Sequence, residues 1–164
     1  MKAKKHLGQH FLTDSSVINN ILDLIQSECP KSEAIVEVGP GQGVLTETLA
    51  HNFEKFQAIE FDRDMVKVLI QKIDPSYIIN EDFLSVDLDA LFGDQEFNLV
   101  GNFPYNISSQ IIFKMLENVS KIPLMIGMFQ KEVAERIVAK EGSSTYGRLS
   151  ILAQWRCNAK LAMN

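Results

Sequence analysis

Apolar residues recur along this chain at two different spacings, and the switches between the spacings predict a series of helices and strands. Residues 17–25 carry apolar side chains at helical spacing, after Asp14, which can cap a helix, and before Pro30, which ends one. Residues 34–38 form a short, mostly apolar run typical of a buried strand, and a helical pattern begins at 44–49. With the glycine-rich stretch 39–43 between them, these residues form a strand–loop–helix unit.

The same alternation continues through the rest of the chain. It predicts strands at 56–60, 77–80, 97–100 and 124–129, and helices at 63–73, 107–119 and 131–139. Residues 149–161 resemble the start of a late strand, with nothing after it to complete the sheet edge, so we expect a chain truncated at its C-terminus. Alternating strands and helices predict one α/β domain over 1–164, a mostly parallel sheet with helices on both faces.

Composition narrows the class of protein. With 46% hydrophobic and 23% charged residues, the chain has the make-up of a globular domain. It contains no run of about 18 apolar residues and no apolar stretch after its basic start, so we expect a cytoplasmic protein that does not bind a membrane. Cys29 and Cys157 lie far apart without metal-type spacing, so we expect neither a disulfide scaffold nor a metal site.

The net charge of −5 is unevenly distributed. Residues 1–10 hold three lysines and no acid, residues 11–120 hold six basic and eighteen acidic side chains, and residues 121–164 hold seven basic and three acidic ones. Phosphate contacts need local cations and not a positive total, so the basic ends permit RNA binding without requiring it.

Three features after successive strands fit one nucleoside-containing ligand. Glycines 39, 41 and 43 suit a tight turn at a helix N-terminus, although a purely structural turn would look the same. The dinucleotide fingerprint would need glycine at position 44, which is Val44, so the spacing favours the GxGxG form of methyltransferases. Glu60 ends the next strand and can accept from both ribose hydroxyls, and Asp82 follows the third strand, where it can accept from an adenine amine.

The sharpest motif is Asn102, Phe103, Pro104 and Tyr105, directly after the fourth strand. Pro104 biases Phe103 toward an extended backbone, so its carbonyl and the Asn102 side-chain oxygen are placed to accept both protons of a planar amine. Two fixed acceptors favour the pyramidal, nucleophilic form of that amine and stabilise the growing positive charge. Tyr105 can stack on a base taken out of its helix. We therefore predict that these four residues are catalytic.

The chain resembles the small-subunit ribosomal RNA adenine dimethyltransferases. The resemblance rests on six motifs in order: GQHFL at 8–12, EVGPG at 37–41, IEFD at 59–62, NFPYNIS at 102–108, QKEV at 130–133 and YGRLS at 146–150. It implies a Rossmann-like class I methyltransferase fold. It also implies dimethylation, from S-adenosylmethionine, of N6 of two adjacent adenosines near the 3′ end of small-subunit RNA. The implied partner is a partly assembled small ribosomal subunit, and we expect a monomer.

The resemblance also implies the residues that contact the cofactor. Family members commonly carry Asn at position 10 and Leu or Ile at position 103, where this chain has His10 and Phe103; a backbone contact at position 10 survives this change. Including Gly41 from the glycine-rich loop, the predicted cofactor contacts are His10, Leu12, Gly39, Gly41, Glu60, Asp82 and Asn102.

Three other functions compete with this interpretation. Methyltransferases of large-subunit RNA that confer macrolide resistance share the Asn-X-Pro-Tyr loop, but residues 39–41 and 146–150 resemble the small-subunit enzymes more closely. A non-catalytic transcription factor derived from the same fold would not need the intact loop at Asn102. A nicotinamide oxidoreductase is opposed by Val44 and by that same loop.

Overall fold

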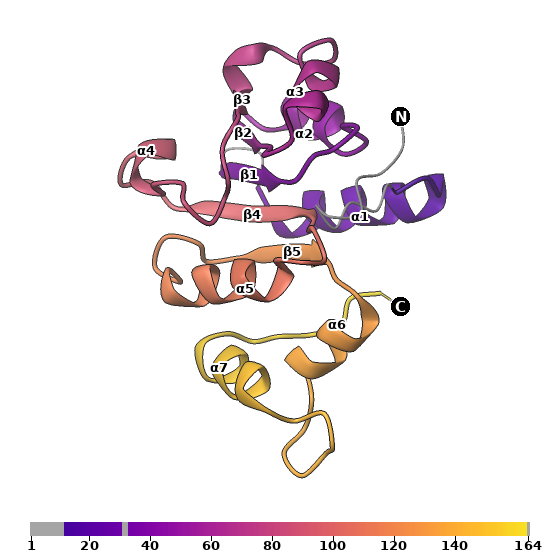
Figure 1. The fold of residues 1–164 in the computed structure, drawn as a ribbon, viewed down its shortest axis with the longest axis vertical. Coiled ribbons are helices and arrows are strands. Elements are labelled where there is room, and N and C mark those ends of the chain that lie inside the picture. Colours follow the sequence, from indigo (N-terminus) through magenta and orange to yellow (C-terminus); the bar gives the residue numbers. More distant parts are fainter. Residues whose placement is uncertain (1–11, 31–32, 164) are drawn as a thin grey trace.

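A parallel sheet forms the centre of the molecule. In a computed structural model, which describes residues 12–30 and 33–163, five strands lie in the order β3-β2-β1-β4-β5, and every pairing is parallel (Figure 1). The strands are β1 (Ala34–Val38), β2 (Lys55–Ile59), β3 (Ile78–Ile79), β4 (Phe97–Asn102) and β5 (Met125–Met128). The predicted parallel sheet is therefore confirmed. The order of the strands reverses between β1 and β4, the point where open α/β sheets bind ligands.

Helices connect the strands. They are α1 (Ser15–Glu28), α2 (Thr46–Asn52), α3 (Arg63–Leu69), α4 (Asp89–Phe92), α5 (Ser108–Glu117), α6 (Lys131–Ile137) and α7 (Arg148–Arg156), with a 3₁₀ turn at Pro75–Tyr77. Asp14 caps α1 as predicted, because its carboxylate accepts the N–H groups of Ser16 and Val17. Within the described residues, no helix is both long and apolar enough to cross a membrane.

The helices cover both faces of the sheet, as predicted. Side chains of a strand point alternately to the two faces, so β1 contributes to two separate cores. Val36 and Val38 pack with α5 and α7 on one face, and Ile35 packs with α1 and α2 on the other.

The expected late strand at 149–161 is wrong for most of its length. Residues Arg148–Arg156 form helix α7, and an irregular segment follows. The apolar residues that pack inward are Leu149, Leu152 and Ala153, which recur at helical spacing, whereas Ile151 and Trp155 point to solvent. The bulky exposed residues made the segment look like a strand, because burial is not visible in the sequence.

Candidate functional site

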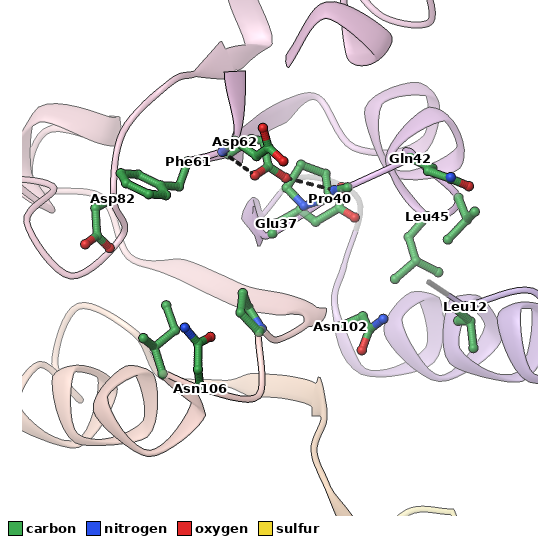
Figure 2. Close-up of a pocket in the computed structure, with 16 residues that line it drawn as sticks. Leu12, Glu37, Pro40, Gln42, Leu45, Phe61, Asp62, Asp82, Asn102 and Asn106 are labelled. Atoms are coloured by element: carbon green, nitrogen blue, oxygen red, sulfur yellow. Dashed lines mark hydrogen bonds between the residues drawn. The ribbon is translucent and has the colours of Figure 1, made fainter. Parts of the chain in front are cut away.

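A cleft lies where the carboxyl ends of β1, β2 and β4 meet, at the reversal of strand order. Figure 2 shows side chains from loops far apart in the sequence around this cleft. Seven of the residues predicted to bind the cofactor or the target base line it: Leu12, Gly39, Gly41, Glu60, Asp82, Asn102 and Pro104. The predicted contact at His10 lies outside the described residues. The fold therefore brings the residues predicted to bind the cofactor and part of the predicted catalytic loop to one cleft.

The glycine-rich loop forms one wall of the cleft. Gly39, Gly41 and Gly43 all have positive φ angles, of 69°, 56° and 77°, a conformation that residues with a side chain rarely adopt. A Cβ at Gly39 would also lie 3.2 Å from Cδ of Pro104. The glycine-rich loop and the loop that starts at Asn102 are therefore in close contact, and Gly39 permits this approach.

Glu60 holds the glycine-rich loop in place. Its Oε2 accepts the N–H of Gly41 at 2.9 Å, and its Oε1 accepts the N–H of Asp62 at 2.8 Å (Figure 2). Burial raises the pKa of this carboxyl, and the two backbone N–H groups oppose that change. Since each carboxylate oxygen has a second lone pair, Glu60 can shape the loop and still accept from ligand hydroxyls.

Glu37 lines the same cleft from within β1. The side chain is 2% exposed, and its Oε2 is buried without a hydrogen-bond partner among the described residues. Burial raises the pKa of this carboxyl from its ordinary value of 4.5 to about 8; the nearby Thr46 hydroxyl opposes this change, and the Glu60 carboxylate adds to it. A buried acid in a cleft, with an unused acceptor, is suited to bind a cationic group of a ligand.

Asp82 and Phe61 lie at the other end of the cleft from Asn102 and Leu12 (Figure 2). Asp82 uses Oδ1 to accept the N–H of Leu84 at 2.9 Å, which fixes the direction of its carboxylate. Phe61 is 61% exposed although it is a large apolar side chain. An exposed aromatic ring beside an acceptor is suited to a flat heterocycle. The sequence interpretation missed Phe61; its position directly after Glu60 was the available signal.

Lys114 of α5 fixes the loop that carries Asp82. Its ammonium group donates to the carbonyl oxygens of Phe83, Leu84 and Val86 at 2.7, 3.1 and 2.7 Å. Burial lowers the pKa of Lys114, and the Asp82 carboxylate opposes this. Three donors with three acceptors satisfy the ammonium group. The helix that follows the Asn102 loop is thereby tied to the loop at the opposite end of the cleft.

Phe103 anchors the predicted catalytic loop in the core. Its ring is 1% exposed and lies 5.2 Å from the ring of Phe129, centroid to centroid. A Cβ at Gly127 of β5 would come within 1.9 Å of this ring, so only glycine leaves room for it. The side chain of Phe103 therefore has a structural role, and only its backbone can serve the cleft.

In the turn after Phe103, backbone carbonyls accept hydrogen bonds from residues three positions further along the chain. Ile107 donates its N–H to Pro104, and the Ser108 hydroxyl donates to Tyr105, both at 3.2 Å. These bonds do not use the carbonyl of Phe103. Tyr105 is half-buried and is not among the residues that line the cleft, so its stacking role stays a prediction.

Comparison with known proteins identifies the family. All residues from 1 to 164 match the model of the ribosomal RNA adenine dimethylase family. The chain belongs to this family. The ribosomal RNA small subunit methyltransferase A of Flavobacterium johnsoniae is 48% identical over 157 residues, which cover 94% of this chain and 59% of that protein. The chain thus spans less than two thirds of the length of such curated relatives.

Two solved structures of methyltransferases share this fold. A dimethyladenosine transferase from Plasmodium falciparum matches with a TM-score of 0.70 and 30% identity, over 88% of this chain and 52% of that one. The 23S rRNA methyltransferase ErmE matches with a TM-score of 0.67 and 28% identity, over 88% and 55%. The predicted Rossmann-like methyltransferase fold is therefore confirmed.

Proposed function

We propose that this chain is the S-adenosylmethionine-binding methyltransferase domain of an enzyme that dimethylates N6 of two adjacent adenosines near the 3′ end of small-subunit ribosomal RNA. The observation that carries this proposal is the cleft itself. The chain belongs to the adenine dimethylase family, and in its cleft the acidic side chains suited to a nucleoside lie next to the loop that starts at Asn102.

The residues of the cleft fit the cofactor. The buried Oε2 of Glu37 lacks a partner within the described chain and suits the ammonium group of the methionine part. Glu60 would accept from the ribose hydroxyls, Asp82 from the adenine amine, and Phe61 would pack on the adenine ring. When bound, S-adenosylmethionine supplies a methyl group on a positively charged sulfur.

The Asn102 loop would act on the target adenine. We propose that the Asn102 side-chain oxygen and the Phe103 carbonyl accept the two amine protons, so that the nitrogen lone pair leaves the plane of the ring and becomes nucleophilic. The buried Phe103 ring supports this function, because it holds the loop rigidly against β5. Tyr105 would stack on the extracted base.

The same proposal covers partners and place of action. The relatives are named for the small subunit, so we propose a partly assembled small ribosomal subunit as the substrate, with the protein acting as a monomer in the cytoplasm.

Mapping of methylated bases tests this function. The protein is incubated with labelled S-adenosylmethionine and unmethylated small subunits, and the modified bases are located by primer extension. We expect label at two adjacent adenosines near the 3′ end of the small-subunit RNA. Absence of label with all small-subunit preparations would contradict the proposal.

The match to ErmE supports one alternative, a methyltransferase of large-subunit RNA. The same assay with naked large-subunit RNA separates the two. Label confined to that RNA would favour the alternative.

A further inference from the structure

A second cavity, of about 440 Å³, lies between α5, the end of α6 and the segment that leads into α7. Its walls include Ser109 and Phe113 of α5, Arg136 of α6, Ser144 and Thr145 of the connecting segment, and Arg148 of α7. Figure 1 shows α6 and α7 beyond α5, away from α2 and α3. The cleft described above and this cavity share no lining residue.

The cavity is cationic. Two arginines and four residues with hydroxyl groups line it, and no residue with a carboxylate does. No described carboxylate lies within ion-pair distance of either Arg136 or Arg148. In a chain with a net charge of −5, two arginines that line one cavity without acidic partners among the described residues are a local excess of positive charge.

The structure holds the walls of the cavity firmly. The guanidinium of Arg148 lies over the ring of Phe113, 5.8 Å from its centroid, which restricts the side chain. The hydroxyl of Ser150 donates to the carbonyl of Arg136 and accepts the N–H of Gly147, at 2.5 and 3.1 Å. Gln154 donates to the carbonyls of Ile137 and Ala139. The two arginines are thus carried by segments that are bonded to each other.

The cavity also lies close to the Asn102 loop in the chain. Ser109 belongs to the first turn of α5, four residues after Tyr105, and the Ser108 hydroxyl bonds back to the Tyr105 carbonyl. The Asn102 loop therefore leads directly into the helix that forms one wall of the cavity.

We propose that this cavity binds phosphate groups of the RNA strand next to the target adenine. This inference rests on the proposed function. Arginine donates paired hydrogen bonds that match two phosphate oxygens, and serine and threonine hydroxyls are common additional donors. Such contacts carry no sequence information; they position the strand so that the base reaches Asn102.

The test is the salt dependence of RNA binding. A fluorescently labelled RNA hairpin with the 3′-terminal sequence of small-subunit RNA is titrated with the full-length protein and with the double variant Arg136→Ala/Arg148→Ala. Each phosphate contact contributes about 0.7–0.9 to the slope of log affinity against log salt. We expect the double variant to lose about 1–2 from this slope and to bind about tenfold more weakly at about 0.1 M salt.

A matched control removes the same charge elsewhere. Arg156 lies on α7, as Arg148 does, and its guanidinium lies 4.8 Å from the centroid of an aromatic ring, that of Trp155. Arg156 does not line the cavity. The variant Arg156→Ala/Lys160→Ala should keep the slope of the unmodified protein. The variant Arg136→Gln/Arg148→Gln, which keeps a polar side chain and removes only the charge and part of the length, replaces the alanine variant if the latter does not fold.

The outcomes separate this inference from the proposed function. If the unmodified protein methylates the hairpin or the subunit while the cavity and control variants have equal slopes, the cavity does not bind RNA and the proposed function stands. If the cavity variants lose affinity only for intact subunits, and not for the hairpin, the cavity binds a protein of the subunit, and the inference is wrong. If the unmodified protein neither binds nor methylates RNA, the proposed function itself fails.

Discussion

The two loops that touch at Gly39 and Pro104 are held by different means. The glycine-rich loop owes its shape to three residues with positive φ and to the carboxylate of Glu60, which binds its backbone. The Asn102 loop owes its position to the ring of Phe103, which is buried over Gly127. One loop is therefore shaped by hydrogen bonds at the edge of a cleft, and the other by packing in the core.

This difference has a consequence for function. A loop held by polar groups can use those same groups on a ligand, because each oxygen of Glu60 retains a second lone pair. A loop held by a buried ring can present a rigid backbone, which suits preorganised contacts to a reacting amine. We therefore expect substitutions in the first loop to alter mainly binding, and those in the second to alter mainly rate or folding.

The largest effect is expected at Asn102. Asn102→Ala should lower the rate of methyl transfer by about 10²–10³, because it removes a fixed acceptor that strengthens its contact in the transition state. Single-turnover methylation measures the rate, and titration measures cofactor affinity. Full activity in a folded Asn102→Ala protein would contradict the catalytic assignment. Asn102→Asp, which keeps an acceptor oxygen, is expected to retain part of the rate.

Gly127 tests whether packing positions the second loop. Gly127→Ala places a Cβ within 1.9 Å of the Phe103 ring, so it should destabilise the protein by about 1–3 kcal/mol and slow methyl transfer. Chemical denaturation measures the first effect. Adding Phe103→Leu, which removes the ring, should recover much of the loss. If the second substitution recovers nothing, the ring does not mediate the effect of Gly127.

Glu60 tests the first loop. Glu60→Ala leaves the N–H groups of Gly41 and Asp62 without their acceptor and removes the predicted ribose contact, so cofactor binding should weaken by about 1–3 kcal/mol. Calorimetric titration with S-adenosylmethionine measures this. The exposed neighbour of Asp82, Glu81, provides the control, since Glu81→Ala should leave the affinity unchanged. Equal affinities for both variants would remove Glu60 from the site.

Glu37 links cofactor binding to pH. Its pKa of about 8 lies above the ordinary 4.5, so the folded protein without ligand binds more protons between these values, and its stability should fall as pH rises through that window. Glu37→Gln should abolish this trend and stabilise the protein at pH 8 by about 1–3 kcal/mol.

Stability should fall as pH rises, whereas affinity for the cofactor should rise. Affinity for S-adenosylmethionine should increase from about pH 6 to about pH 8, because the ionised carboxylate binds the ammonium group. Glu37→Gln should flatten this increase, and the exposed Glu54→Gln should not. Thermal melts and titrations across that range measure both trends. A pH-independent affinity in the unmodified protein would disconnect Glu37 from the ligand.

The local pattern of the sequence determined the order in which strands and helices follow each other along the chain. It also determined the glycine-rich loop and the positions of Glu60, Asp82 and Asn102 at strand ends. These features follow from residue spacing within a few turns or strands, and parallel strands necessarily bring their carboxyl ends to one edge. The helix at Arg148–Arg156 is the exception, because its exposed Ile151 and Trp155 obscured the helical spacing of the residues that pack inward.

Only the tertiary structure decided which atoms meet across those elements. Four features join residues that are distant in the chain. Gly127 leaves space for the Phe103 ring, and three carbonyls surround the Lys114 ammonium group. Burial shifts the pKa of Glu37, and Arg136 and Arg148 line one cavity. Close packing and desolvation depend on distances between elements, which local residue patterns do not encode.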